Sequence, residues 1–189
     1  LADPETCSVI DAASISLQYQ SPILEFAQSR VTHLNAIAQP LIDSYSIDLR
    51  APIHGWGWHD PLPAPGRGWM RWTGPQRESA VHLPFTLKIG AIVRVTIIGT
   101  VAADLIESAL LEVNGAVVET TLTSVGDAVV PHFVLEGRVT QTWDEPHSRL
   151  ILRVAQTLPW KSIDDSSSDA TEFGIAISAI TVSPDTRSE

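Results

Sequence analysis

Four tryptophans crowd between residues 56 and 72, and they are the side chains best suited to contact an external ligand. They lie in His54-Gly-Trp-Gly-Trp-His-Asp60 and in Gly66-Arg-Gly-Trp-Met-Arg-Trp-Thr-Gly-Pro75. Flat indole faces match the apolar C–H face of a pyranose ring, and nearby polar side chains can hydrogen-bond its hydroxyl groups. The candidate ligand-binding residues are therefore Trp56, Trp58, His59, Asp60, Arg67, Trp69, Arg71 and Trp72. Because indoles also fill sandwich cores, packing is the alternative interpretation.

The glycines beside the first two tryptophans suggest how these rings are presented. An extended chain over 54–58 would place His54, Trp56 and Trp58 on one face of a strand. Gly55 and Gly57 would leave the opposite face bare, which allows a ligand or another chain to approach the backbone closely.

The sequence carries no recognisable catalytic, cofactor-binding or metal-binding motif. It has no Gly-x-Ser-x-Gly, phosphate-binding loop or dinucleotide-binding glycine pattern, and its six histidines form no His-x-His or His-Glu-x-x-His pair. We therefore predict no catalytic residue, no cofactor and no metal. The acidic stretch 164–169 lacks the ligand spacing of a calcium loop. The alternative is a hydrolase or lyase in which some of the following residues converge: His54, His59, Asp60, Asp144 and Glu145.

Apolar and polar residues alternate with period two after Ser46, which is typical of strands with one face on a core. The alternating runs include Val81–Leu87, Val93–Ile97, Phe133–Leu135, Leu150–Val154 and Phe173–Ile177. About eight or nine such strands, with no helical period between them, predict an all-β fold. We expect an antiparallel two-sheet sandwich, jelly-roll-like, over residues 46–183.

The clearest local prediction is a β-hairpin at Asn114-Gly115, because both residues tolerate the positive φ angles of a type I′ turn. A two-residue loop fixes the register of the flanking strands. The expected facing pairs are Val113 with Ala116, Leu111 with Val118, and Ala109 with Thr120. Glu112 and Glu119 then fall on the opposite face.

An N-terminal segment, 1–45, precedes the predicted sandwich, and a short tail, 184–189, follows it. Ser21 as N-cap, Pro22 at the first helical position and Pro40 as a stop predict a helix at about 22–39. This helix either packs on its own domain, connects two domains, or joins subunits into a homo-oligomer. Leu1 stands where a complete chain would carry methionine, so we expect a piece of a longer protein.

Composition narrows the range of partners. The net charge of −10 repels the phosphate backbone of nucleic acid and anionic membrane surfaces, whereas a neutral sugar is compatible with it. No apolar run approaches the ~18 residues of a membrane helix, so we expect no membrane insertion. The single cysteine, Cys7, and the absence of a signal-peptide pattern predict a cytoplasmic location, with the inner membrane face reached through the parent protein as the alternative.

The tryptophan motifs resemble the "Gly-Trp … acidic … Arg-Trp" opening of β-sandwich accessory domains attached to bacterial glycosyltransferases and other surface-polysaccharide assembly proteins. The Asn-Gly hairpin and the final strand Phe173–Ile180 also fit that type. The chain departs from it at Asp60, where a glutamate is expected, and at 170–172, where an arginine-containing segment is expected.

The resemblance implies a non-catalytic carbohydrate-binding module of a polysaccharide biosynthesis protein, with a glycan as ligand and a catalytic domain in the same parent chain as partner. The sugar is not implied. The alternative function is a structural or oligomerisation domain that positions a catalytic partner domain, with the tryptophans in its core or at its interface.

Overall fold

The computed structural model describes residues 44–126, 132–162 and 166–184. They belong to one compact unit, Asp43–Glu189. The predicted helix at 22–39, and with it the predicted subunit contact, lies outside the described residues. No described helix has the length and apolarity that crossing a bilayer requires.

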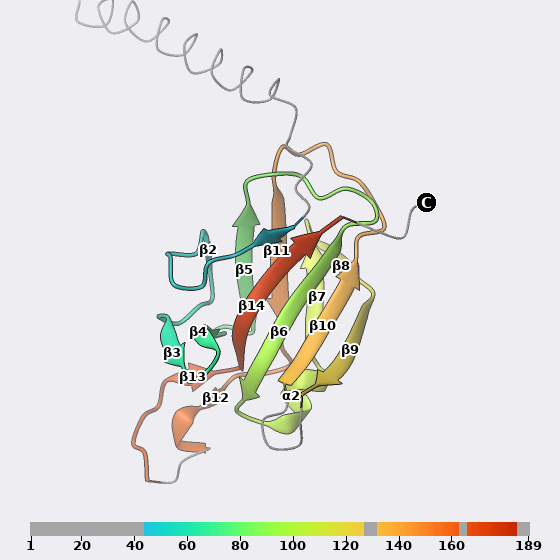
Figure 1. The fold of residues 1–189 in the computed structure, drawn as a ribbon. Coiled ribbons are helices and arrows are strands. Elements are labelled where there is room, and N and C mark those ends of the chain that lie inside the picture. The colour runs from blue at the N-terminus through green and yellow to red at the C-terminus, as the bar shows by residue number, and fades with distance from the viewer. Residues whose placement is uncertain (1–43, 127–131, 163–165, 185–189) are drawn as a thin grey trace, which may run out of the picture. The chain divides into compact units, whose positions relative to one another are not determined.

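The larger of the two main sheets has seven strands (Figure 1). In space they run β3-β4-β14-β6-β10-β9, and β1 pairs with β14. Their bounds are β1 (Tyr45–Ser46), β3 (Leu62–Ala64), β4 (Gly68–Trp72), β6 (Ile92–Thr100), β9 (Thr120–Val125), β10 (His132–Arg138) and β14 (Ile175–Ser183).

The second main sheet has five strands in the order β2-β5-β11-β7-β8. Their bounds are β2 (Gly55–Trp56), β5 (Glu78–Leu83), β7 (Leu110–Val113), β8 (Ala116–Val118) and β11 (Ser148–Arg153). The smaller elements are α2 (Ala103–Glu107), β12 (Leu158–Pro159), the 3₁₀ turn η1 (Trp160–Ser162) and β13 (Glu172–Phe173). Every strand pair is antiparallel, so the predicted all-β antiparallel fold is confirmed for the described residues.

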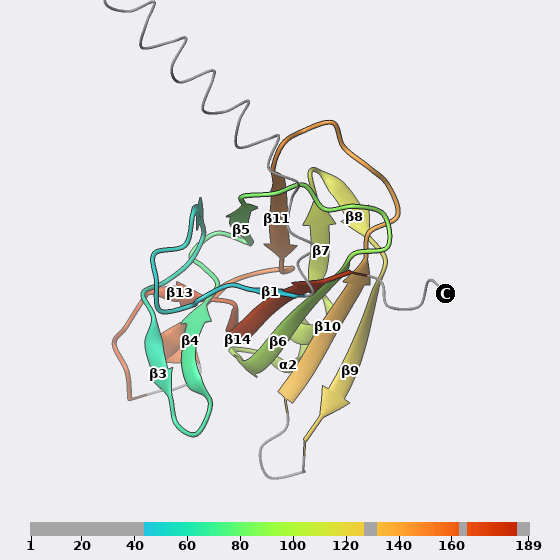
Figure 2. The same cartoon turned by 45° about the horizontal axis from the view of Figure 1, so that its top comes forward.

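The core lies between the two main sheets, which Figure 2 shows as two layers. Ile97, Leu135 and Ile177 enter it from the seven-stranded sheet, and Leu83 and Leu111 enter it from the five-stranded sheet. All five side chains are fully buried. The period-two alternation predicted strands with one face on a core, and these strands do turn one face to the core between the sheets.

The predicted hairpin forms between β7 and β8. Val113 faces Ala116 and Leu111 faces Val118, as expected. Asn114 has a φ of 48° and Gly115 a φ of 85°, which are the positive angles that the turn requires. The third expected pair, Ala109 with Thr120, is wrong. The chain changes sheets after β8, so Thr120 starts β9 and faces Gly137 instead.

Candidate ligand-binding site

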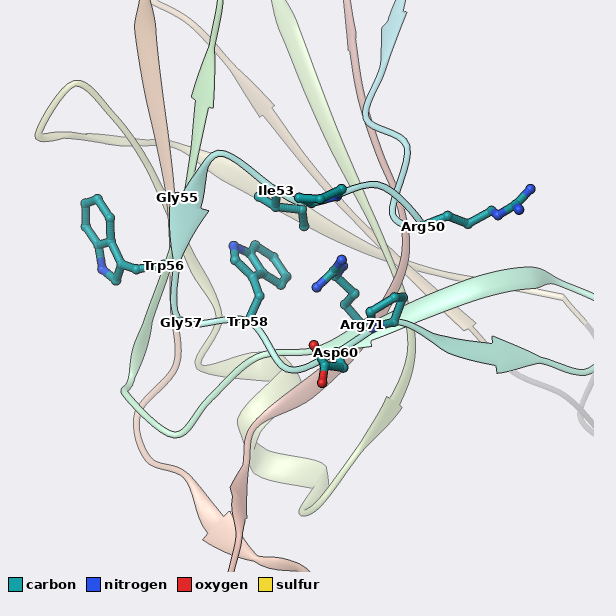
Figure 3. A pocket seen from close by; sticks show the side chains of 10 residues that line it. Arg50, Ile53, Gly55, Trp56, Gly57, Trp58, Asp60 and Arg71 are labelled. Carbon is teal, nitrogen blue, oxygen red and sulfur yellow. The ribbon is translucent and has the colours of Figure 1, made fainter.

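A pocket of about 380 Å³ lies beside β2, between the segments that precede and follow that strand (Figure 3). Its apolar wall includes Ile53, Trp58 and Pro61. Arg50, Asp60 and Arg71 supply its charged groups, and Trp56 borders it at β2 with its ring turned away from the other labelled side chains (Figure 3). Four of the eight predicted site residues therefore line it: Trp56, Trp58, Asp60 and Arg71.

The Arg71 side chain joins the segments that form the pocket by hydrogen bonds to their backbone carbonyls. It lies on β4, only 7% exposed, and donates from Nε to the Leu49 carbonyl at 2.8 Å. Its Nη1 donates to the His59 carbonyl at 2.8 Å and its Nη2 to the Ala51 carbonyl at 3.0 Å. One guanidinium thus ties the segments on both sides of β2 to the sheet, so Arg71 positions the pocket wall.

Gly55 and Gly57 bring β2 close to its neighbour β5. A Cβ at Gly55 would lie 1.8 Å from the Ala80 carbonyl oxygen, and one at Gly57 would lie 2.1 Å from the Glu78 carbonyl oxygen. The expectation of a close approach to bare backbone is correct. The approaching segment, however, is a strand of the same chain, so this face is not available to a ligand.

Trp56 and Trp58 point to opposite sides of the chain, so the expectation that they share a face is wrong (Figure 3). The reason is Gly57, whose φ of 77° interrupts the extended conformation. Trp58 packs against the core and donates from its indole nitrogen to the Ala80 carbonyl at 2.8 Å. Trp56 stays 42% exposed, and its ring lies 5.7 Å from that of His82.

Asp60 and Arg50 are the charged groups of the pocket that are open to solvent. Asp60 is exposed, and its carboxylate has no hydrogen bond or ion pair to any described residue. The Arg50 guanidinium lies 5.3 Å from the centre of the Trp69 ring, an arrangement that favours stacking. Trp69 is 36% exposed, lies beside this arginine and does not line the pocket.

Trp72 and His59 belong to an aromatic cluster and do not line the pocket. Trp72, 7% exposed, packs edge-on against Trp160 at 5.7 Å and Phe173 at 5.6 Å. The His59 ring lies 4.3 Å from that of Phe173, and its Nε2 is 2.9 Å from the Glu172 carbonyl oxygen. The geometry gives both side chains a packing role.

Arg67 lies on the turn between β3 and β4, where its backbone N–H donates to the Ala64 carbonyl at 2.9 Å, and it does not line the pocket.

Four residues that line the pocket were not predicted from the sequence: Arg50, Pro52, Ile53 and Pro61. Only their proximity to the tryptophan cluster in the sequence could have indicated them.

The hydrolase alternative finds no support in the pocket. Glycoside hydrolysis uses two carboxyl groups, and among the described residues Asp60 alone brings a carboxyl group to this pocket. Asp144 and Glu145 lie in the connection between β10 and β11, and neither they nor His54 and His59 line it.

Within the described ranges, no three His, Cys, Asp or Glu side chains gather closely enough to hold a metal ion. Asp169, at the end of the acidic stretch 164–169, accepts a hydrogen bond from the backbone N–H of Thr171 in a local turn. Hydrogen bonds from the hydroxyl and then the N–H of Thr171 lower the pKa of Asp169 below its usual value of 3.8. This carboxylate therefore stays ionised under ordinary conditions and stabilises the lead-in to β13.

Comparisons with protein-family models, with curated proteins and with solved structures found no match to the chain. The assignment of a function therefore rests on the site itself.

Proposed function

We propose that this domain is a non-catalytic carbohydrate-binding module of a larger polysaccharide biosynthesis protein. The observation that carries the proposal is the exposed indole of Trp56 beside a pocket that combines an apolar wall with the carboxylate of Asp60, which has no partner among the described residues. Sugar sites combine these two features, because the ring face is apolar and its rim is polar. The motif resemblance supports the same class.

Each group has a role in this proposal. One pyranose ring stacks on Trp56, and a neighbouring ring of the same glycan enters the pocket on the other side of β2, where the Asp60 carboxylate accepts hydrogen bonds from its hydroxyl groups. Arg50 donates hydrogen bonds to ring or hydroxyl oxygens while Trp69 supports its guanidinium plane. Trp58 and Arg71 keep the pocket in shape through their contacts with backbone carbonyls.

The wider setting belongs to the same proposal. The strand connections are of the jelly-roll type, the parent protein carries a catalytic domain that delivers or elongates the glycan, and the location is cytoplasmic. The polysaccharide and that catalytic domain are the proposed partners.

Replacing Trp56 by alanine tests the proposal. Because its side chain is 42% exposed, we expect a stability loss of at most about 1 kcal/mol. Loss of the stacked ring should weaken glycan binding by about 1–2 kcal/mol, or roughly tenfold. Calorimetric titration with a panel of bacterial polysaccharide fragments measures the binding, and urea unfolding measures the stability.

The matched control is Trp69→Ala, which removes an indole of similar exposure that supports Arg50 without lining the pocket. It should weaken binding less than Trp56→Ala does. If no fragment of the panel binds the wild-type domain, or if Trp56→Ala binds as tightly as the wild type, the proposal is wrong.

A second candidate function is a domain that positions a catalytic partner. The favouring observation is the hairpin β3–β4, which exposes Leu62 (43%) and Trp69 (36%) to solvent. Such side chains can anchor a protein interface. Sedimentation velocity over a range of concentrations tests self-association. A monomer at all concentrations would dispose of the oligomeric version of this function.

A further inference from the structure

The outer face of the five-stranded sheet, which turns away from the core, carries a second set of polar groups next to Trp56. Cross-strand partners share a face of the sheet. Trp56 faces Ala80, Ala80 faces Ile151, and Ile151 faces Glu112. The adjacent row contains His82 on β5 and Arg149 on β11, which face each other. Asn114 follows on the β7–β8 turn, where its N–H donates to the Arg149 carbonyl at 2.9 Å.

The two arginines of this face differ in their partners. Arg153 forms ion pairs with Glu78 and Glu112, each at 2.9 Å. Arg149, which is half-buried, forms no ion pair with any described residue. Both acidic groups of the face are therefore already engaged by Arg153. In the part of the chain that the structure describes, the positive charge of Arg149 is therefore left without a counter-charge.

The donors around Arg149 also lack acceptors. The Nε of Arg149 and the Nδ2 of Asn114 are buried, and neither finds a hydrogen-bond partner among the described residues. The orientation of the Asn114 amide is fixed, because its Oδ1 accepts the Arg149 N–H at 2.6 Å and so must be the oxygen. Buried donors are almost always paired, so these two favour an outward shift of the half-buried Arg149 side chain that lets an acceptor from outside the chain reach them. The Nε of Arg153 is likewise without a partner among the described residues, but both Nη groups of that arginine are engaged by Glu78 and Glu112.

We propose that Arg149 and Asn114, with His82 beside them, bind the carboxylate of an acidic sugar such as a uronic acid. A neighbouring ring of the same glycan stacks on Trp56, whose indole lies 5.7 Å from the ring of His82. Trp56 and Arg149 are two strands apart and offset by two residues along the strand, about 12 Å at the usual strand spacing and rise, which a disaccharide and the long arginine side chain can bridge. This inference rests on the proposed function and adds the chemical class of the glycan to it.

The overall charge of the chain does not oppose this binding mode. The net charge of −10 acts over the whole molecule, but salt screens it beyond about 8 Å at physiological ionic strength. Beside His82 and Asn114, the Arg149 guanidinium has no ion-pair partner among the described residues, and an arginine–carboxylate pair is a strong, charge-assisted contact.

Binding of oligogalacturonides of defined length, compared with the same oligomers after reduction of their carboxyl groups, tests the inference on the full chain. The two probes differ only in the carboxylate. We expect the wild type to bind the acidic oligomer about tenfold more tightly, as one charge-assisted hydrogen-bonded pair provides. Arg149→Gln should remove this preference, and Arg149→Lys should keep part of it. Arg94→Gln is the matched control, because it removes the same charge from the other sheet and should keep the preference.

Equal affinities of the wild type for the acidic and the reduced oligomer would overturn the inference but leave the proposed function standing. Tighter binding of a sulfated oligosaccharide without carboxyl groups would assign the site to sulfate esters and overturn the carboxylate. Equal binding of poly-glutamate would show a general anion site instead of a glycan site. No binding of either oligomer would also contradict the inference, and the wider fragment panel would then decide the proposed function separately.

Discussion

Replacing Arg71 by methionine is expected to lower the free energy of unfolding by about 3 kcal/mol. Methionine matches the length of the arginine stem but cannot donate to the carbonyl oxygens of Leu49, Ala51 and His59. A hydrogen bond from a charged group contributes about 1.5–3 kcal/mol. Two of these carbonyls are only partly buried and can be rehydrated, so the loss falls short of the full sum. Urea unfolding followed by circular dichroism measures the change.

Arg50→Met is the control for this substitution, because it removes the same charge from the same pocket. The Arg50 side chain is exposed and stacks on Trp69, so its loss should cost less than about 1 kcal/mol. Arg71→Lys should also destabilise, since one ammonium group cannot reproduce the three directions of the guanidinium. Equal unfolding midpoints for Arg71→Met and the wild type would show that Arg71 does not hold the pocket together.

Gly57→Ala is expected to destabilise the domain by about 3 kcal/mol or more. The added Cβ would lie 2.1 Å from the carbonyl oxygen of Glu78 and 2.9 Å from the Cα of Ser79. Both are backbone atoms of the β5 region, so neither can move without breaking strand pairing. The positive φ of 77° adds strain of about 1–2 kcal/mol. Urea unfolding again measures the effect, and iodide quenching of tryptophan fluorescence should increase as β2 separates from β5.

Gly66→Ala separates the two causes. Gly66 has a similar φ of 72°, but a Cβ there would have no atom within 4 Å. It should therefore show only the strain of about 1–2 kcal/mol and leave quenching unchanged. If the two alanine variants were equally stable, the close approach of β2 to β5 would not be the reason for glycine at position 57.

Local patterns predicted most of the fold. Period-two alternation located the long strands, and the Asn114-Gly115 pair fixed two of three expected contacts between β7 and β8. The third contact failed because Thr120 joins the other sheet, where it pairs with Gly137, a residue distant from the hairpin in the sequence. Likewise the run Val81–Leu87 ends as a strand at Leu83, since Pro84 has no N–H to continue a ladder.

The site was less predictable, because its contacts join segments that are distant in the sequence. Clustered tryptophans and a carboxylate pointed to the right stretch of chain, and Trp56, Trp58, Asp60 and Arg71 do line one pocket. Trp72, which looks equivalent in the sequence, instead packs against Trp160 and Phe173. No local pattern reveals such partners.

Arg149 was missed because nothing in the sequence distinguishes it from other polar strand residues. It alternates with apolar residues like any solvent-facing strand residue, and only the register shows that Arg153, not Arg149, takes both glutamates of that face.

The indole N–H signals of the six tryptophans, observed by nuclear magnetic resonance during titration with a glycan, show whether the Trp56 ring contacts the sugar. Assignment by single Trp→Phe variants identifies each signal. We predict that the Trp56 signal moves with glycan concentration and saturates, while the signal of Trp72 stays in place. A Trp56 signal that stays fixed throughout the titration, for every fragment of the polysaccharide panel, would contradict it.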